Sequence, residues 1–291
     1  WKAPDILHST RQVCPLKDKP SGNVPDVEGQ SLAHFQRSGW LGHQVVYRET
    51  VGSTNDLALE LVLEGAGEGL VVLADEQSAG RGRLNRRWSA PPGTCLLMSL
   101  VFHPQSGFQD EARRITMACG LALRDAICEN TGVPVWLKWP NDVIVTREST
   151  WAKVAGMLSE VGLIQGNPAV LVVGIGLNVN VPAETLSQLS PNAASLQVEA
   201  GRWFDRSALL DAFLSLVELR VAALRSGVDV LDAWRDAQAW MGRSVVVTLP
   251  TGAIMGIAES VDEDGALILR LPDGSTHRAV AGDVSLRLAA T

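Results

Sequence analysis

The sequence has few of the features that mark membrane, secreted or general nucleic-acid-binding proteins. No apolar run reaches the roughly 18 residues of a membrane span, and residues 1–30 contain charges and prolines but no apolar core of a signal peptide. The balance of 25 Lys+Arg against 32 Asp+Glu gives a formal charge of −7. General binding to nucleic acid or to anionic membranes relies on a broad basic surface. We therefore expect a cytoplasmic protein with no membrane partner and no general affinity for DNA.

Cysteine is also scarce. Cys14, Cys95, Cys119 and Cys128 show neither a CxxC pair nor any other spacing typical of a metal site. We expect reduced thiols that mostly fill the core. The sequence identifies no metal ligands, and it contains no internal repeat and no low-complexity tract.

Three segments with different textures can be distinguished. Residues 1–44 are irregular, with at most a short helix near "SLAHFQ", and lack the two amphipathic helices of a helix-turn-helix. Residues 45–240 alternate predicted helices and buried strands; Ser53 or Thr54 is expected to cap the first helix. Residues 241–291 contain short strands joined by "TG", "DEDG" and "PDG" turns, which predicts a small β-barrel of the SH3 type. We expect an irregular extension, a large domain and a small domain.

The stretch "GRGRLNRRW" (80–88) places four arginines on a loop between two predicted strands of an acidic protein. Gly80 and Gly82 are expected to adopt positive φ and to let the backbone approach a ligand. Arg81, Arg83 and Arg86 offer forked donors to phosphate or carboxylate oxygens, and the flat face of Trp88 suits a planar ring. The loop indicates one anionic ligand; a solvated Arg/Gly loop or a nucleic-acid contact stays an alternative.

Three further stretches combine small residues with polar side chains at strand ends. In "KWPNDV", Lys138, Asn141 and Asp142 could hold a triphosphate, an adenine edge or hydrated Mg²⁺, although Pro-Asn-Asp turns are also common without any ligand. In "KVAGMLSEV", small residues after Lys153 leave room for a ligand against the strand, unless the lysine is simply solvated. In "GIGLNVN", Asn178 ends an apolar strand and needs a partner, either in the protein or in a ligand.

Together, "STN", "EQSAGRGRLNRRW", "KWPNDV", "KVAGMLSEV" and "GIGLNVN", in this order, resemble the catalytic domain of the biotin–protein ligases, and "DVSLR" resembles that family's C-terminal domain. The resemblance covers roughly residues 45–290. Several bacterial members carry an N-terminal DNA-binding domain and act as repressors. Because residues 1–44 are short and irregular, we expect a monofunctional ligase.

The resemblance implies a fold, a reaction and partners. The fold would be α+β: a central mixed β-sheet packed with helices over residues 45–240, and an SH3-like barrel over residues 241–291. The family joins biotin to ATP with Mg²⁺, giving biotinyl-5′-AMP and pyrophosphate. It then passes the biotinyl group to a lysine of a biotin carboxyl carrier domain of a biotin-dependent carboxylase. Such a reaction needs no covalent enzyme nucleophile, because positioning and charge stabilisation lower the barrier.

The resemblance also implies a role for each matching side chain. Lys153 and Arg83 would be catalytic, and Arg83 would keep the loop closed by pairing with the ligand or with an acid on a neighbouring strand. The implied biotin-binding residues are Ser53, Thr54, Asn55, Gln77, Gly80, Arg81, Gly82, Arg83, Lys153, Gly156 and Leu158. The implied ATP-binding residues are Arg83, Arg86, Trp88, Lys138, Asn141, Asp142, Asn178 and Arg287.

One departure and two alternatives bear on this interpretation. "VTRESTWAKVAG" inserts extra polar residues before Lys153, so that the assignment of this lysine depends on its "KVAG" context. A lipoate–protein ligase of the same fold is the nearest alternative, and a non-enzymatic regulatory or nucleic-acid-binding protein is another. The residues leave open whether the protein is a monomer or a homodimer, and which carrier protein it modifies.

Overall fold

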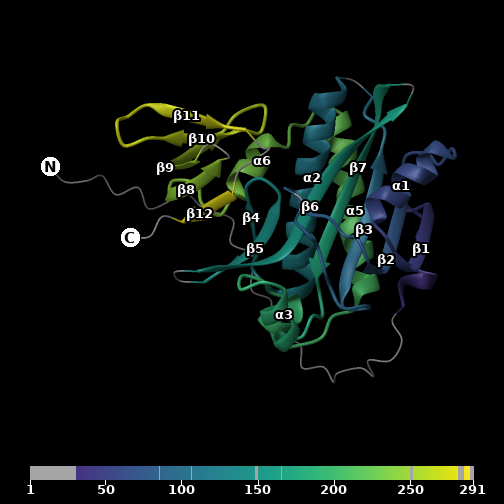
Figure 1. The fold of residues 1–291 in the computed structure, drawn as a ribbon. Coiled ribbons are helices and arrows are strands. Elements are labelled where there is room, and N and C mark those ends of the chain that lie inside the picture. The colour runs from purple at the N-terminus through teal and green to yellow at the C-terminus, as the bar shows by residue number, and fades with distance from the viewer. Residues whose placement is uncertain are drawn as a thin grey trace.

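A seven-stranded mixed sheet forms the centre of the molecule (Figure 1). The computed structural model describes residues 31–84, 86–105, 107–147, 150–164, 166–249, 252–280 and 285–288, with the side chains of residues 164, 167, 168 and 285–288 left out. The strand order is β1-β2-β3-β7-β6-β5-β4; β1 and β2 are parallel, and the other neighbouring pairs are antiparallel. Its strands are β1 (Gln44–Val51), β2 (Leu70–Gln77), β3 (Cys95–Phe102), β4 (Trp136–Lys138), β5 (Asp142–Thr146), β6 (Trp151–Ile164) and β7 (Asn167–Asn178).

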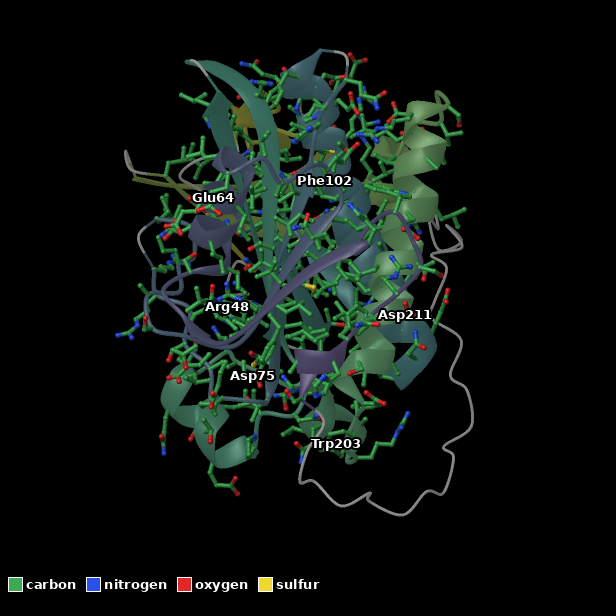
Figure 2. All side chains as sticks on the ribbon, turned by 90° about the vertical axis from the view of Figure 1, so that its right-hand side faces the viewer. Arg48, Glu64, Asp75, Phe102, Trp203 and Asp211 are labelled. Atoms are coloured by element: carbon green, nitrogen blue, oxygen red, sulfur yellow. The ribbon has the colours of Figure 1, made fainter. Side chains whose placement is uncertain are left out.

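Helices cover both faces of this sheet because its strands carry apolar side chains on both sides. On β2, Leu70 and Val72 pack with α1 (Thr54–Leu63), whereas Val71 and Leu73 belong to the larger core with α2 (Phe108–Thr131) and α5 (Arg206–Arg225). Figure 2 shows the sheet between α1, whose C-cap is Glu64, and α5, which carries Asp211. The shorter helices are η1 (Leu32–His34), α3 (Ala183–Leu189), α4 (Leu196–Ala200) and α6 (Leu231–Asp236).

The C-terminal part forms a second, antiparallel sheet beside β4 (Figure 1). Its order is β11-β10-β9-β8-β12, built from β8 (Ser244–Leu249), β9 (Gly252–Val261), β10 (Leu267–Arg270), β11 (Thr276–Ala279) and β12 (Ser285–Leu288). This small sheet and the central mixed sheet confirm the predicted fold class.

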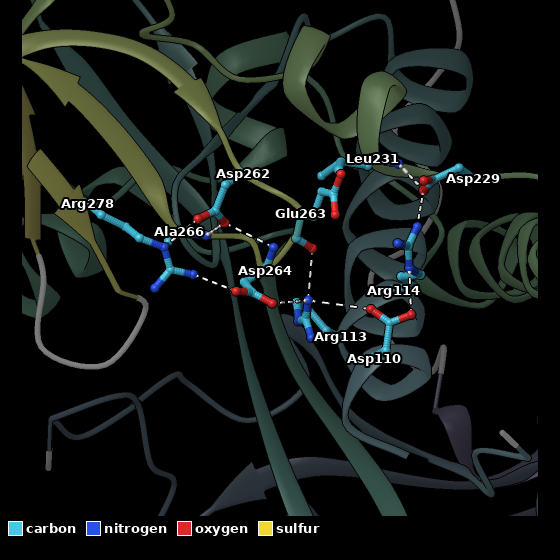
Figure 3. Close-up of polar contacts among 10 residues, drawn as sticks. All are labelled: Asp110, Arg113, Arg114, Asp229, Leu231, Asp262, Glu263, Asp264, Ala266 and Arg278. Atoms are coloured by element: carbon cyan, nitrogen blue, oxygen red, sulfur yellow. Dashed lines mark hydrogen bonds and ion pairs between the residues drawn. The ribbon is translucent and has the colours of Figure 1, made fainter. Parts of the chain in front are cut away.

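The turn between β9 and β10 joins the two sheets. Arg113 of α2 donates to Glu263 O at 2.8 Å and to Asp264 Oδ1 at 3.2 Å, as Figure 3 shows. The indole of Trp139, which is fully buried, donates to Gly265 O at 2.8 Å. Since Trp139 follows β4, the small sheet directly contacts the "KWPND" segment.

The main predicted elements are present, and the differences are local. The sequence interpretation did not identify β1, α3, α4 or β11, and the short helix near residue 32 is a single 3-10 turn. Cys95, Cys119 and Cys128 are buried thiols that form no disulfide, as expected, and burial raises the pKa of the Cys95 thiol to about 12. Cys14 lies outside the described residues. No helix in the described ranges is both long and apolar enough to cross a membrane.

Candidate active site

The candidate site lies on the face of the central sheet that α1 covers only in part. Val170 and Val172 of β7 pack under α1, whereas the next residues with the same orientation are Gly174 and Gly176. The change from valine to glycine leaves an open cavity at this end of the sheet. This first cavity is lined by Ser53, Thr54, Asn55, Gln77, Arg81, Gly82, Arg83, Arg86, Trp88, Lys138, Pro140, Asn141, Asp142, Lys153, Gly156, Met157, Leu158, Gly174, Ile175 and Gly176.

Antiparallel pairing aligns the polar groups across the sheet. Lys138 pairs with Asp142, Asp142 with Gly156, and Gly156 with Gly176, so that these four residues form one row over β4, β5, β6 and β7. Directly paired residues of antiparallel strands share a face. The sequence interpretation expected these polar side chains at the end of a strand, and the hairpin of β4 and β5 brings Lys138 and Asp142 opposite each other.

The glycines of β7 are required by two side chains that occupy the space above them. A Cβ on Gly174 would lie 2.3 Å from Asn55 Oδ1, and a Cβ on Gly176 would lie 2.4 Å from the Trp88 ring. Asn55 donates to Leu158 O at 3.2 Å and to Glu160 Oε2 at 2.5 Å, and its Oδ1 accepts from the Ser99 hydroxyl at 2.6 Å. Asn55 is thus held in one orientation at the floor of the cavity.

The start of α1 is capped from β2. Ser53 takes the N-cap position but makes no capping hydrogen bond with its side chain, contrary to the prediction. Instead, Gln77 Oε1 accepts from Thr54 N at 2.8 Å and from Thr54 Oγ1 at 3.1 Å. Gln77 thus caps α1, and it also lines the first cavity.

The arginine stretch forms a tight hairpin rather than an irregular loop. Gly82 N donates to Arg86 O at 2.7 Å, and Trp88 N donates to Gly80 O at 2.9 Å. The predicted positive φ at Gly80 and Gly82 is wrong, whereas Leu84 has a φ of 59°. Gly80 serves close packing, since a Cβ there would lie 2.6 Å from Trp88 O.

Two arginines of this hairpin contact the rest of the domain through different partners. Arg81 donates to both carboxylate oxygens of Asp56 at 2.6 Å and lies 3.2 Å from both oxygens of Glu160. The hydrogen bonds to Asp56 are the main cause of a raised pKa of Arg81, and Glu160 adds to it. The same hydrogen bonds lower the pKa of the Asp56 carboxyl. Arg83 donates to Asn141 Oδ1 at 3.2 Å, which connects the hairpin to the segment after β4.

Asp142 pairs with two lysines that each lie over a tryptophan ring. Lys153 Nζ is 2.6 Å from Asp142 Oδ1, and Lys138 Nζ is 3.3 Å from Asp142 Oδ2. Lys153 Nζ lies 5.2 Å from the Trp88 ring centroid, and Lys138 Nζ lies 4.9 Å from the Trp151 ring centroid. Burial would raise the pKa of Asp142, but Lys153 and Lys138 outweigh it and hold the pKa below its usual 3.8. Burial lowers the pKa of Lys138 below its usual 10.5, although Asp142 opposes the shift.

A bulge in β6 aims Lys153 at this site. Ile144 pairs with Lys153, whereas the adjacent Val143 pairs with Ala155, so Val154 is an extra residue in β6. In a regular strand, positions 153 and 156 would face opposite sides of the sheet because they are three residues apart. The bulge puts Lys153 beside Gly156, where a Cβ would lie 2.6 Å from Nζ.

A second cavity adjoins the first and shares part of its lining. Arg86, Trp88, Lys138, Asp142 and Lys153 border both cavities. The remaining walls of the second cavity are Arg87, Ser89, Trp151, Asn178, Leu189, Ser190, Pro191, Asn192 and Ala193. The charged groups therefore lie at the boundary between two adjoining spaces.

Two of the predicted ATP residues stand apart from the rest. Asn178 lines the second cavity, and its amide already has protein partners: it donates to Ala194 O at 3.0 Å and accepts from the Cys95 thiol at 3.4 Å. Arg287 belongs to β12, and its side chain lies outside the described residues.

Comparison with known proteins decides the family. The model of the Biotin/lipoate A/B protein ligase family matches residues 47–178, and that of the Biotin protein ligase C terminal domain matches residues 241–287. The biotin--[acetyl-CoA-carboxylase] ligase of Mycobacterium tuberculosis is 34% identical over 253 residues, which span 85% of this chain and 90% of that protein. The chain belongs to the biotin protein ligase family.

Other members share the architecture of this ligase. The bifunctional ligase/repressor BirA of Escherichia coli is 30% identical over 252 residues, covering 85% of this chain and 75% of BirA. The structure of the Aquifex aeolicus biotin protein ligase in complex with biotin and ATP superimposes with a TM-score of 0.69 at 27% identity. It covers 84% of this chain and 99% of that one.

The polar groups of the site do not fit a metal ion held by the ligase itself. No group of three or more His, Cys, Asp or Glu side chains suited to a metal occurs in the described ranges. The carboxylate at the boundary, Asp142, has a lysine on each oxygen.

The sequence interpretation missed several residues that shape the ligase site. Ser99 orients Thr54 and Asn55, Asp56 and Glu160 hold Arg81, and Trp151 covers Lys138. Asp56 is adjacent to the "STN" motif, so a search for acids next to the predicted site could have found it. Ser99 lies on a uniformly buried strand, and no sequence signal distinguishes it.

Proposed function

We propose that this ligase joins biotin to ATP, releasing pyrophosphate, and transfers the biotinyl group from biotinyl-5′-AMP to a carrier lysine. In the first step a biotin carboxylate oxygen attacks the α-phosphorus, and the bond to pyrophosphate breaks. In the second step the carrier amine attacks the mixed anhydride, and AMP leaves with the bonding electrons. The observation that supports this proposal most is the shared boundary of the two cavities, where Lys153, Lys138 and Arg86 gather.

The first cavity suits the ring system of biotin. Its floor presents hydroxyl and amide groups from Thr54, Asn55 and Gln77, which can pair with the ureido group of biotin, and Leu158 and Gly156 border it. Biotin bound there with its carboxylate toward Lys153 would bring that carboxylate to the boundary. This assigns the biotin head to the first cavity.

The second cavity suits the nucleotide. One wall of this cavity is apolar and lies near positive charges; it consists of Trp88, Trp151, Leu189 and Pro191. Mg·ATP placed there would set its α-phosphate near Lys153 and Arg86, which would stabilise the charge that develops on the phosphoryl oxygens. In this arrangement Asp142 keeps Lys138 and Lys153 in place until the phosphates bind.

The proposed domain division follows from this chemistry. Residues 45–240 would form the catalytic unit, and residues 241–291 would support the nucleotide side, with Arg287 of β12 contacting ATP. The acceptor would be the biotin carboxyl carrier domain of a biotin-dependent carboxylase, as the names of relatives such as the M. tuberculosis ligase suggest. The reduced, buried cysteines favour a cytoplasmic location.

The decisive experiment is incubation of the protein with biotin, Mg·ATP and a biotin carrier domain, followed by intact mass measurement of the carrier. We expect a mass gain of one biotinyl group that requires both substrates, together with pyrophosphate release. A carrier of unchanged mass and no pyrophosphate would refute the proposal.

A lipoate–protein ligase is the competing function, because the matching family model covers both. Isothermal titration with biotin and with lipoate separates the two. The hydrogen-bonding floor of Thr54, Asn55 and Gln77 favours biotin, since the dithiolane ring of lipoate has no amide to pair with it. Tighter binding of lipoate would reverse the assignment.

A further inference from the structure

The hairpin of residues 80–88 is held to the domain at its Arg81 end by two acids from different elements. Asp56 comes from the first turn of α1 and binds the Arg81 guanidinium with both oxygens at 2.6 Å. Glu160 comes from β6 and lies 3.2 Å from the same guanidinium. Bidentate pairing fixes the plane of an arginine as well as its position. One side chain of the hairpin is thereby attached both to α1 and to the sheet.

Glu160 has a second contact, with Asn55, which lines the first cavity. Its Oε2 accepts from Asn55 Nδ2 at 2.5 Å, while the Asn55 Oδ1 accepts from Ser99. One carboxylate thus touches both the hairpin that borders the cavity and the amide that forms its floor. A movement of Arg81 would therefore shift Glu160 and, through it, Asn55, and a ligand that moves Asn55 would shift Arg81 by the same route.

We propose that Asp56 and Glu160 are positioning residues that hold the 80–88 hairpin closed over bound biotinyl-5′-AMP, and that Glu160 couples this closure to the orientation of Asn55. The proposal rests on the proposed function. Closure by Arg81 lengthens the time that the intermediate stays on the enzyme. Neither acid contacts the reacting atoms, so both act through Arg81 and Asn55.

The expected change in the release rate follows from the solvent exposure of the Arg81–Asp56 ion pair. The side chains of Arg81 and Asp56 are 40% and 47% exposed, and exposed ion pairs contribute modestly to the free energy of the state that contains them. Loss of one such pair should raise the release rate of biotinyl-5′-AMP about two- to five-fold. Adenylate formation should change less, because the charges at Lys153 and Asp142 are untouched.

The test compares Asp56→Asn with the parent protein and with Asp211→Asn as a matched control. Asp211 also pairs with an arginine, Arg37, at 3.1 Å and is 56% exposed, but it lies on α5 across the sheet from α1 (Figure 2). Each protein is loaded with biotin and Mg·ATP without a carrier. Free biotinyl-5′-AMP is followed by chromatography and pyrophosphate by a coupled assay. We expect faster release from Asp56→Asn alone, with pyrophosphate formation in the first turnover close to the parent value.

Two further measurements separate positioning from a general structural effect. Glu160→Gln should release the intermediate faster and also raise the KM for biotin, whereas Asp56→Asn should leave that KM near the parent value. Added KCl should raise release from the parent, because salt weakens exposed charge pairs, but should have little effect on release from the Asp56→Asn, Glu160→Gln double variant.

The outcomes are distinct from those that test the function itself. Pyrophosphate formation by the parent without any increase in release for Asp56→Asn or Glu160→Gln would overturn the inference and leave the ligase function intact. Equal acceleration by Asp211→Asn would overturn it as well, by showing a general loss of rigidity. Absence of pyrophosphate from the parent would instead refute the proposed function.

Discussion

The two cavities of the site are built in different ways. The first has a polar floor of neutral hydroxyl and amide groups that bond to one another and to Glu160. At the boundary with the second, a carboxylate and two lysines meet, and the "KWPND" segment behind them contacts the small C-terminal sheet through Trp139 and Gly265.

This difference has a physical consequence for each substrate. Hydrogen bonds between neutral groups depend on distance and angle, so the first cavity should be sensitive to changes of a few tenths of an ångström. Charge interactions act over longer distances and tolerate small shifts. The first cavity should therefore respond to local packing, and the second to charge and to the position of the small sheet.

Lys153 borders both cavities and should give the largest effect when removed. We expect Lys153→Ala to reduce kcat for pyrophosphate release on the order of 100-fold or more, as for other electrostatic catalytic groups. Biotin affinity, measured by isothermal titration, should change much less. Near-normal pyrophosphate release would show that Lys153 is not catalytic and that the boundary between the cavities is not the reaction centre.

Gly174→Ala tests whether the first cavity depends on close packing. The added Cβ would lie 2.3 Å from Asn55 Oδ1, so Asn55 must move and lose hydrogen bonds. We expect roughly a tenfold loss of biotin affinity, the equivalent of one buried hydrogen bond left unmade, with little change in the KM for ATP. Gly67→Ala is the control, since nothing lies within 4 Å of a Cβ there. Unchanged biotin binding by Gly174→Ala would contradict the assignment of Asn55 to the biotin floor.

Trp139→Phe tests whether the second cavity depends on the small sheet. The change removes the hydrogen bond to Gly265 O and leaves a buried carbonyl unpaired, which costs about 1–3 kcal/mol. We expect a higher KM for ATP and an unchanged dissociation constant for biotin. Trp240→Phe is the control: Trp240 is also buried, and its Nε1 has no partner among the described residues. A rise in both constants, or in neither, would show that the small sheet does not act on the nucleotide side specifically.

The smallest expected effect concerns the pH dependence of the Arg81 anchor. The pKa of Asp56 is lowered in the folded protein, chiefly by the Arg81 hydrogen bonds, so its contribution to stability is present above the usual carboxyl pKa of 3.8 and is lost as pH falls through the lowered value. The difference in free energy of unfolding between the parent and Asp56→Asn should be constant at neutral pH and should shrink in acid. Urea unfolding at a series of pH values measures it. A difference independent of pH would mean that the aspartate charge is not what stabilises the fold.

Much of the fold follows from patterns that depend on neighbouring residues in the chain. The apolar runs at 70–75 and 95–102 and the period of α5 each specify one element, and "DEDG" specifies the turn that reaches Trp139. β1 was missed because its residues are mostly half-buried or exposed and lack a clear alternation. Short helices such as α3 depend on packing against a finished core, which local sequence does not contain.

The cavities bring together the predicted residues of α1, the hairpin, β4–β5 and β6, but the contacts between them depend on pairing that the sequence does not reveal. Asp142 was predicted to serve the nucleotide, whereas its pairing with two lysines required the register of β4, β5 and β6. Arg81 contacts Asp56, which is 25 positions away in the chain, and Glu160, which is 79 positions away. The motif resemblance predicted which residues gather at the cavities, whereas strand pairing determines which of them contact one another.

The bulge at Val154 separates a connection whose length can vary from a strand segment whose length is fixed. The extra residues before Lys153 are accommodated in the connection from β5 to β6, where Arg147 N bonds to Thr150 O at 2.9 Å and the Ile144–Lys153 pairing is kept. Insertions in that connection leave the position of Lys153 in the sheet unchanged. A residue added between Lys153 and Gly156 while the bulge is kept would instead turn the lysine to the opposite face of the sheet. Within a few residues, the chain thus passes from a connection whose length can vary to a strand in which the position of Lys153 fixes the length.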